Sequence, residues 1–356
     1  MRPQRQLLFW LAAFAAFVFF LHVFSAILLP FAAGIALAYV LDPLATSLER
    51  RGFSRLAATL CILLVFVVLL ILALVLILPA LANELADFVS RIPDYADRLQ
   101  SLFAAFLNSR LAHFFGIDPA SIRTSFSSFM SQGATWLTAL LASLWSGGKA
   151  MLAVLSLLLI TPVVAFYLLY DWDRLVAFLD DLLPRDHADQ IRDIAREIGQ
   201  MVAAFVRGQG LICVILALYY GIGLELAGIN FGFLVGFAAG ILSFIPYLGT
   251  ALGLLGSIGL ALAEYWPDWS HAAIAVAIFV IGQIVNDYLL VPRLIGSSVG
   301  LHPVWVIFSF FAFGLLFGFV GLIIAIPAAA AIGVLVRYAI ARYRDSPIYL
   351  GKGPPP

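Results

Sequence analysis

One stretch of the sequence limits the possible folds more than any other. Leu56–Leu78 runs for 23 residues without a charged side chain. A helix needs about 20 apolar residues to cross about 30 Å of hydrocarbon. A helix is suited to that environment because all its backbone polar groups bond within the segment. The sequence therefore predicts at least one transmembrane helix.

The composition extends this prediction to the whole chain. Of 356 residues, 63% are hydrophobic and 11% are charged, and the mean hydropathy is +1.06. Soluble domains carry about 25% charged residues, and their surfaces are already more than half apolar. The 20 basic side chains balance 20 acidic ones, so no positive field would attract nucleic acid. These values exclude a soluble enzyme, a disordered chain and a nucleic-acid binder. They favour an all-α polytopic protein whose main partner is the lipid bilayer.

Other apolar runs predict further spans, and two segments between them differ in character. Residues 80–148 place apolar side chains at helical spacing among charges, which is typical of an amphipathic helix outside the hydrocarbon. Residues 171–208 hold eight acidic residues and five arginines and predict a solvated helical hairpin. The first apolar run is too long for a signal peptide, so we expect it to be retained. The additional predicted membrane segments are Leu7–Leu29, Pro30–Leu44, Met151–Tyr170, Leu211–Leu226 and Ala272–Leu290.

Two apolar stretches have lengths that suit neither one crossing nor two. Phe231–Ala263 has 33 residues, about 50 Å as a helix, whereas two crossings need about 60 Å plus a turn. Pro303–Val336 presents the same difficulty. Proline and glycine interrupt both stretches. We therefore expect two broken or re-entrant helical hairpins, within a total of about seven or eight membrane segments.

The basic residues indicate an orientation. With both long stretches as hairpins, 15 of the 20 Lys and Arg residues fall on the side of the N-terminus. Cytoplasmic loops carry such an excess, so we expect both termini in the cytoplasm of a bacterium, with the protein in its inner membrane. The predicted organisation is N-terminal transmembrane helices (1–79), an extracytoplasmic amphipathic segment (80–148), a transmembrane helix (149–170), a cytoplasmic hairpin (171–208), a C-terminal transmembrane core (209–340) and a cytoplasmic tail (341–356).

Candidate pathway residues lie at the breaks and along one polar helix face. Irregular backbone at membrane depth is tolerated where it lines a cavity, and half-helix ends offer free polar groups to a solute or ion. The breakers can equally serve close helix packing, and the polar side chains can serve as inter-helix bonds or lie at the interface. The candidate substrate or ion pathway comprises Pro246, Gly249, Gln283, Asn286, Asp287, Arg293, His302, Gly318, Gly321 and Pro327.

Catalytic and metal-binding motifs carry little weight in this sequence. Gly296–Gly300 matches the hydrolase pattern G-x-S-x-G, but it joins two predicted membrane helices rather than a strand and a helix. Cys61 and Cys213 both lie inside apolar runs, where a disulfide or a metal ligand is not expected. We therefore expect no enzymatic activity, no cofactor and no metal.

Several strings in order resemble one family of bacterial membrane proteins. They are Pro30–Gly34, Leu37–Leu44, Glu49–Gly52, Phe166–Asp171, Ile245–Gly249, Pro292–Gly296, Val299–Pro303 and Ala325–Pro327. Together they resemble the autoinducer-2 exporter family, also called PerM-like permeases. The resemblance extends from about residue 30 to 335, whereas 80–148 and the tail carry no matching motif. It implies an oligomeric inner-membrane transporter with no enzymatic activity.

Three functions remain open at this stage. The first is a secondary exporter of a small polar signalling molecule of the autoinducer-2 type. The second is a sodium(cation)/proton antiporter, which needs a titrating acid such as Asp287 or Glu225. The third is a non-transporting oligomeric membrane scaffold. The expected partners are accordingly a small polar solute or a cation, and further copies of the chain in a homo-oligomer.

Overall fold

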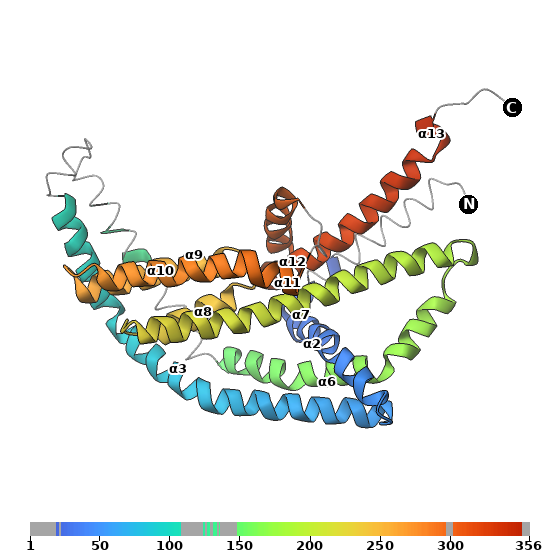
Figure 1. Ribbon diagram of the computed structural model, residues 1–356, viewed down its shortest axis with the longest axis horizontal. Coiled ribbons are helices and arrows are strands. Elements are labelled where there is room, and N and C mark those ends of the chain that lie inside the picture. Colours follow the sequence, from blue (N-terminus) through green and yellow to red (C-terminus); the bar gives the residue numbers. More distant parts are fainter. Residues whose placement is uncertain are drawn as a thin grey trace. The chain divides into compact units, whose positions relative to one another are not determined.

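The computed structural model describes residues 19–20, 23–107, 124, 127–128, 131–133, 135, 148–296 and 302–350. Within these ranges every regular element is a helix (Figure 1). Seven of the helices are long and apolar enough to cross a membrane. The prediction of an all-α polytopic membrane protein is confirmed.

The first described helix differs from the predicted boundaries. Helix α2 (Ser25–Glu49) runs through Pro30 and Pro43, so the prediction that a new segment begins at Pro30 is wrong. Membrane helices tolerate an internal proline because neighbouring groups satisfy the freed backbone. The Thr161 hydroxyl, far along the chain, donates a hydrogen bond to the Pro30 carbonyl oxygen over 3.3 Å and so packs against α2 at this position. Most of the predicted span Leu7–Leu29 lies outside the described residues.

The strongest predicted span is part of a much longer helix. Helix α3 (Arg55–Leu107) has 53 residues, about 80 Å at 1.5 Å per residue. It contains all of Leu56–Leu78 and continues through Pro79 and Pro93 into the predicted amphipathic segment. The membrane span and the first part of 80–148 thus belong to one continuous helix, which curves along its length in Figure 1.

The predicted solvated hairpin consists of the ends of two long helices. Helix α6 (Gly148–Asp181) is followed by a short turn, η1 (Arg185–His187), and by α7 (Ala188–Leu226). Across this turn the Arg192 guanidinium contacts the Asp180 carboxylate at 2.6 Å, and this contact holds its two arms together.

Both predicted hairpins are broken. Helices α8 (Gly232–Leu242) and α9 (Leu248–Tyr265) are separated by the turn that contains Pro246. Helix α12 (Pro303–Arg344) is interrupted at Gly318, whose φ of 60° and ψ of −137° are not helical. Its two parts meet at a sharp angle in Figure 1 (brown and red). A side chain at Gly321 would overlap the Phe313 carbonyl, so these parts fold back closely on each other.

The chain forms two compact units, each built from separated segments. Unit 1 comprises residues 1–66, 156–209 and 291–356, and unit 2 comprises 67–155 and 210–290. Unit 1 contains α2, the first turns of α3, most of α6, the first half of α7, α12 and the short helices α11 (Val291–Leu294) and α13 (Pro347–Leu350). Unit 2 contains the rest of α3 and α7, with α8, α9, α10 (Ser270–Val285) and the π-helix η2 (Asn286–Leu290).

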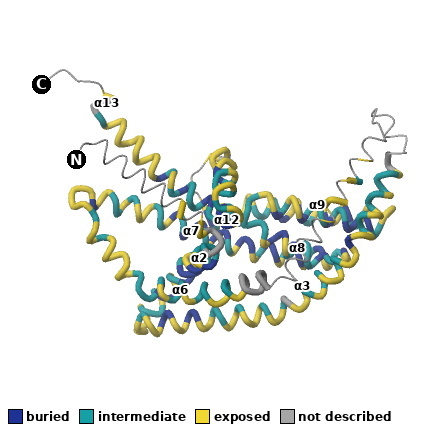
Figure 2. Tube along the Cα trace, turned by 180° about the vertical axis from the view of Figure 1, so that it is seen from behind, coloured by how far each residue is buried: buried dark blue, intermediate teal, exposed yellow. Residues whose placement is uncertain are grey.

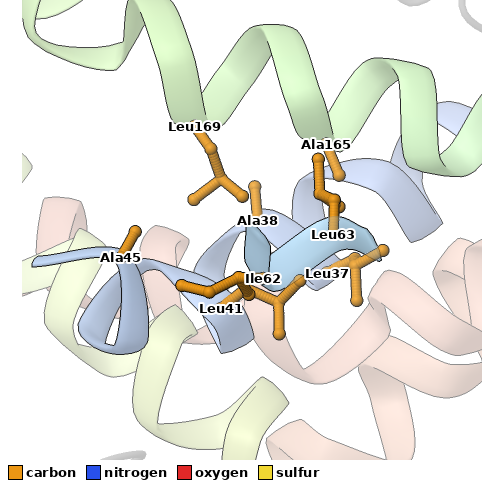
Figure 3. Packing of buried hydrophobic residues seen from close by; sticks show 8 residues of the cluster. All are labelled: Leu37, Ala38, Leu41, Ala45, Ile62, Leu63, Ala165 and Leu169. Carbon is orange, nitrogen blue, oxygen red and sulfur yellow. The ribbon is translucent and has the colours of Figure 1, made fainter. Parts of the chain in front are cut away.

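Unit 1 has an apolar core between α2, α3 and α6 (Figure 3). Leu37 and Leu41 of α2 pack with Ile62 of α3 and with Ala165 and Leu169 of α6. At one end of this core, Arg55 binds Asp42 and Glu49 at 2.9 and 3.0 Å and the Leu169 carbonyl at 2.8 Å. One guanidinium thus ties three helices together, because each of its three nitrogen atoms donates to a different acceptor.

Unit 2 is held together by close backbone packing. Gly232, Gly236 and Gly240 form one face of α8, four residues apart. Added side chains there would run into the α7 backbone at Leu224, Tyr220 and Ala217, respectively. Small residues let membrane helices approach in this way and gain van der Waals contact. Figure 2 shows buried residues (dark blue) along α7 and α8, while long stretches of α3 are exposed (yellow).

Candidate substrate and ion pathway

A polar cluster joins α9 to the end of α10 within unit 2. The Thr250 hydroxyl donates to the Gln283 amide oxygen over 2.9 Å. The Gln283 amide nitrogen donates in turn to both oxygens of the Asp287 carboxylate, each at 2.9 Å. The Asn286 amide donates to the same carboxylate over 3.1 Å. Two amides therefore hold one acidic group at a defined position. We call Thr250, Gln283, Asn286 and Asp287 the polar cluster.

The backbone under this cluster is irregular. Residues Asn286–Leu290 form the π-helix η2 directly after the regular turns of α10. A π-turn widens the helix by one residue and frequently marks a functional site. Gln283 and Asp287 are four residues apart and so share one helix face, and Asn286, the first residue of η2, contacts the same carboxylate.

Two polar atoms beside the cluster lack partners. Tyr220 is completely buried and its ring stacks on Phe279, with centroids 4.4 Å apart. Its hydroxyl is buried and makes no hydrogen bond with any described residue, although Thr250 and Asp287 lie near it. The Asn286 amide oxygen is likewise buried without a partner in the described part of the chain. Because such groups normally find a partner, both are candidates to bind a solute or an ion.

The cluster lies at membrane depth. Gln283 is 13 residues from the first residue of α10, Ser270, which corresponds to about 20 Å along the helix. Trp266 and Trp269 are exposed just before Ser270, where aromatic side chains typically mark the membrane interface. Gln283, Asn286 and Asp287 therefore fall within the apolar span Ser270–Leu294, away from that interface, and Thr250 falls within the neighbouring span Leu248–Tyr265.

The structure brings together only part of the predicted site. Gln283, Asn286 and Asp287 meet as described, and Gly249 directly precedes Thr250 in the first turn of α9. A side chain at Gly249 would overlap the Ala239 carbonyl, so this glycine also serves close packing. Pro246 lies in the turn before α9, and Tyr247 after it has a left-handed φ of 65°. Non-glycine residues avoid that region, so the turn carries backbone strain.

The other five predicted residues belong to unit 1. The His302 ring accepts a hydrogen bond from the Val304 N–H over 3.3 Å and so caps the start of α12. Arg293 lies on α11. The remaining three, all within α12, are Gly318 at the break, Gly321 where the two parts approach, and Pro327 in the second part. The pathway role of all ten residues stays a prediction.

Sequence reasoning missed Tyr220 and Thr250. Tyr220 lies in an apolar span, 30 residues before Thr250 in the sequence, so its closeness to the cluster is visible only in the fold. Thr250 directly follows the predicted break, and that position was a signal for it. Among the described residues no group of three His, Cys, Asp or Glu side chains has the spacing of a metal site.

Comparison with known proteins agrees with this architecture. The model of the AI-2E transporter family matches residues 7–341. The chain belongs to this family. It is 29% identical to the "Putative permease PerM" of Escherichia coli strain K12 over 324 residues, which are 88% of each protein. It is 25% identical to the "Putative transport protein YueF" of Bacillus subtilis over 333 residues, 92% of this chain and 88% of the relative.

A cyanobacterial relative shows the same relation. The chain is 27% identical to the "Putative transport protein sll0063" of Synechocystis over 325 residues, 87% of this chain and 76% of the relative. The predicted family is thereby confirmed, and the protein is a multi-pass membrane protein of a transporter family. The names of these relatives describe transport rather than catalysis.

Proposed function

We propose that this protein is a secondary transporter of the bacterial inner membrane that exports a small polar signalling molecule of the autoinducer-2 type. The observation that carries the proposal is the polar cluster within two apolar spans, beside a Tyr220 hydroxyl and an Asn286 amide oxygen that have no partner among the described residues. A polyhydroxylated solute exchanges hydrogen bonds with such donors and acceptors. Membership of the AI-2E family supports a transporter of this kind.

The two broken hairpins are the proposed moving parts. Pro246 and Gly249 shape the turn between α8 and α9, which leads directly into Thr250 of the cluster. Gly318, Gly321 and Pro327 shape the break in α12. Discontinuous helices in transporters provide free backbone groups near the midplane and change position as access alternates. In this account Arg293 and His302 provide further polar contacts along the route, and both termini lie in the cytoplasm.

A sodium/proton antiporter is the second candidate. Asp287 supplies a carboxylate, and the Asn286 amide oxygen beside it has no partner among the described residues. Hard cations prefer oxygen ligands of this type, and an acid at membrane depth is a functional candidate by default. The same site thus has the chemistry to bind a cation, alone or together with a solute.

Transport by the purified protein in sealed liposomes tests both candidates. Autoinducer-2 and a pH dye are followed together under a proton gradient, a sodium gradient or neither. Solute movement that depends on one gradient supports the exporter and identifies its coupling ion. Proton movement driven by sodium alone supports the antiporter. Folded protein that moves neither under any gradient contradicts both and leaves the oligomeric scaffold.

A pair of acid-to-amide variants shows whether the polar cluster is responsible. We expect Asp287→Asn to reduce transport by about tenfold or more, because it removes the negative charge that the two amides hold. A loss of about 1.4 kcal/mol in binding the solute or ion corresponds to a factor of ten. The control is Asp268→Asn in the exposed loop before α10, where the Ser270 N–H and hydroxyl lower the pKa of the Asp268 carboxyl. This control should transport normally. Equal activity of the two variants would remove Asp287 from the mechanism.

A further inference from the structure

Helices α3 and α9 form two adjoining pockets of opposite character within unit 2. One pocket of about 390 Å³ is polar, and another of about 270 Å³ is mostly apolar. Tyr95 lines both, so they meet at its ring. The polar pocket is lined by Arg91, Asp94, Tyr95, Asp97, Arg98 and Glu264. The apolar pocket includes Phe88, Ile92, Leu99, Leu255 and Leu260.

The charged groups of the polar pocket are incompletely paired. The Arg91 guanidinium lies 5.8 Å from the centre of the Phe231 ring, and Arg98 donates to the Ala263 carbonyl over 3.1 Å. Neither arginine forms an ion pair with any described acidic side chain. One oxygen of Glu264 accepts from Tyr95 and from the Asn230 amide, while its other oxygen is buried with no described partner.

This arrangement selects for a zwitterion. Two guanidinium groups are suited to a phosphate, which they bind with charge-assisted hydrogen bonds. Asp94, Asp97 and Glu264 line the same pocket and are suited to an ammonium group. With three carboxylates against two guanidinium groups, the pocket disfavours a ligand that carries only negative charge. A ligand with both charges satisfies both sets of side chains.

The position of the pockets indicates a lipid rather than a solute. Glu264 is at the end of α9, two residues from Trp266, and exposed tryptophan is typical of the membrane interface. From there, Leu260 and Leu255 continue the lining about 13 Å along α9 toward the apolar part of the helix. A charged group at the interface with an apolar pocket running inward has the form of a head group followed by an acyl chain.

We propose that these two pockets together form a binding site for a zwitterionic phospholipid such as phosphatidylethanolamine. Its phosphate binds Arg91 and Arg98, and its ammonium group binds the Glu264 carboxylate with Asp94 and Asp97. One acyl chain occupies the apolar pocket over Leu255 and Leu260. The site does not depend on the transported solute, and its test has no transport readout.

Native mass spectrometry of the full chain released from detergent tests the site. Defined phosphatidylethanolamine and phosphatidylglycerol are added in equal amounts, and lipid adducts are counted. We expect phosphatidylethanolamine to be retained in preference, and the double variant Arg91→Gln/Arg98→Gln to retain it about tenfold less well. The control Arg174→Gln changes an exposed arginine that pairs with Asp171 in unit 1 and should leave retention unchanged. Equal retention of both lipids, or a double variant that binds like the parent, overturns the proposal.

A second variant tests the apolar pocket and guards against misfolding of the first. Leu255 is 69% exposed, so Leu255→Ala opens no packed core and leaves a residue suited to hydrocarbon, yet it should retain the lipid less well because most of the apolar lining side chain is lost. Free O-phosphoethanolamine is the competing soluble source of the same head group. If it displaces the lipid at equal concentration, or if Leu255→Ala binds the lipid normally, the site recognises a soluble zwitterion and the lipid assignment is wrong.

Discussion

The two broken hairpins interrupt their helices in different ways. Between α8 and α9 the chain leaves the helix over several residues, and the following turn places Thr250 in a hydrogen-bonded cluster with α10. In α12 a single residue, Gly318, breaks the helix. In its first part the buried Ser309 donates its hydroxyl to the Val306 carbonyl oxygen of the same helix, over 2.7 Å. The polar contacts that α12 makes with α7, from Arg337 to Glu197 and from Tyr338 to Gln190, lie near its C-terminal end and far along the helix from Gly318. A broken helix is therefore not in itself a site, because in the first hairpin the polar contact between helices lies directly beside the break.

The largest loss of stability should appear when a methyl group is added to the glycine face of α8 that packs on α7. In Gly240→Ala the new methyl group overlaps the backbone of α7 at Ala217, and backbone cannot move aside. Overpacking costs about 1–3 kcal/mol or more, so we expect a marked loss of folded protein in detergent. The control Gly256→Ala on α9 meets only Val235 at an ordinary 3.5 Å. Equal thermal stability of the two variants would show that the close α7–α8 packing does not hold unit 2 together.

At the break in α12, the effect of a substitution should come from the backbone conformation and not from a lack of room for the side chain. A methyl group at Gly318 meets nothing within 4 Å, but φ is +60°. We expect Gly318→Ala to cost about 1–3 kcal/mol through strain. Gly199→Ala on α7 has equally open space and a helical φ, so it should be neutral or stabilising by up to about 1 kcal/mol. Thermal unfolding of both variants measures the difference, and a stable Gly318→Ala protein would mean that the break is not held by this residue.

Removing one polar contact from each hairpin should change the unfolding free energy by smaller amounts. Thr250→Val removes the donor to Gln283, and bonds between membrane helices contribute on average about 0.6 kcal/mol, up to about 1.7. Ser309→Ala removes a bond within one helix turn and should cost less. Unfolding free energies in mixed detergent compare them. A greater loss for Ser309→Ala would reverse the contrast drawn between the hairpins.

The smallest effect concerns the starts of the helices. Glu84 of α3 accepts a hydrogen bond from the Leu234 N–H in the first turn of α8, whereas α12 is capped by its own His302. A carboxylate near a helix N-terminus contributes about 0.3–1 kcal/mol. We therefore expect Glu84→Gln to lower the melting temperature slightly. If Glu84→Gln is instead as damaging as Gly240→Ala, then α3 contributes far more to α8 than one cap.

The sequence was sufficient to predict features that depend on local pattern. Apolar length predicted the spans, and the spacing of Pro246 and Gly318 within overlong stretches predicted both breaks. It did not predict that α2 continues through Pro30, because in a sequence a proline signals a helix boundary, whereas membrane helices accept an internal proline. The Tyr220 hydroxyl was missed because Thr250 and Asp287, which lie near it, are far from it in the chain. Contacts between distant residues decide which polar groups meet, and periodicity does not record them.

Access of water to the polar cluster tests the central claim most directly. In a protein with Cys61→Ser and Cys213→Ala, the variant Thr250→Cys is exposed to a membrane-impermeant maleimide in sealed liposomes. The matched control is Ser257→Cys, two turns along α9, where the native hydroxyl is fully buried and bonds to the Leu254 carbonyl of its own helix. We expect the cysteine at position 250 to react from one aqueous face and to be protected by the transported solute, while that at 257 stays unreacted. A cysteine at 250 that reacts only after unfolding, under every gradient, would contradict the account.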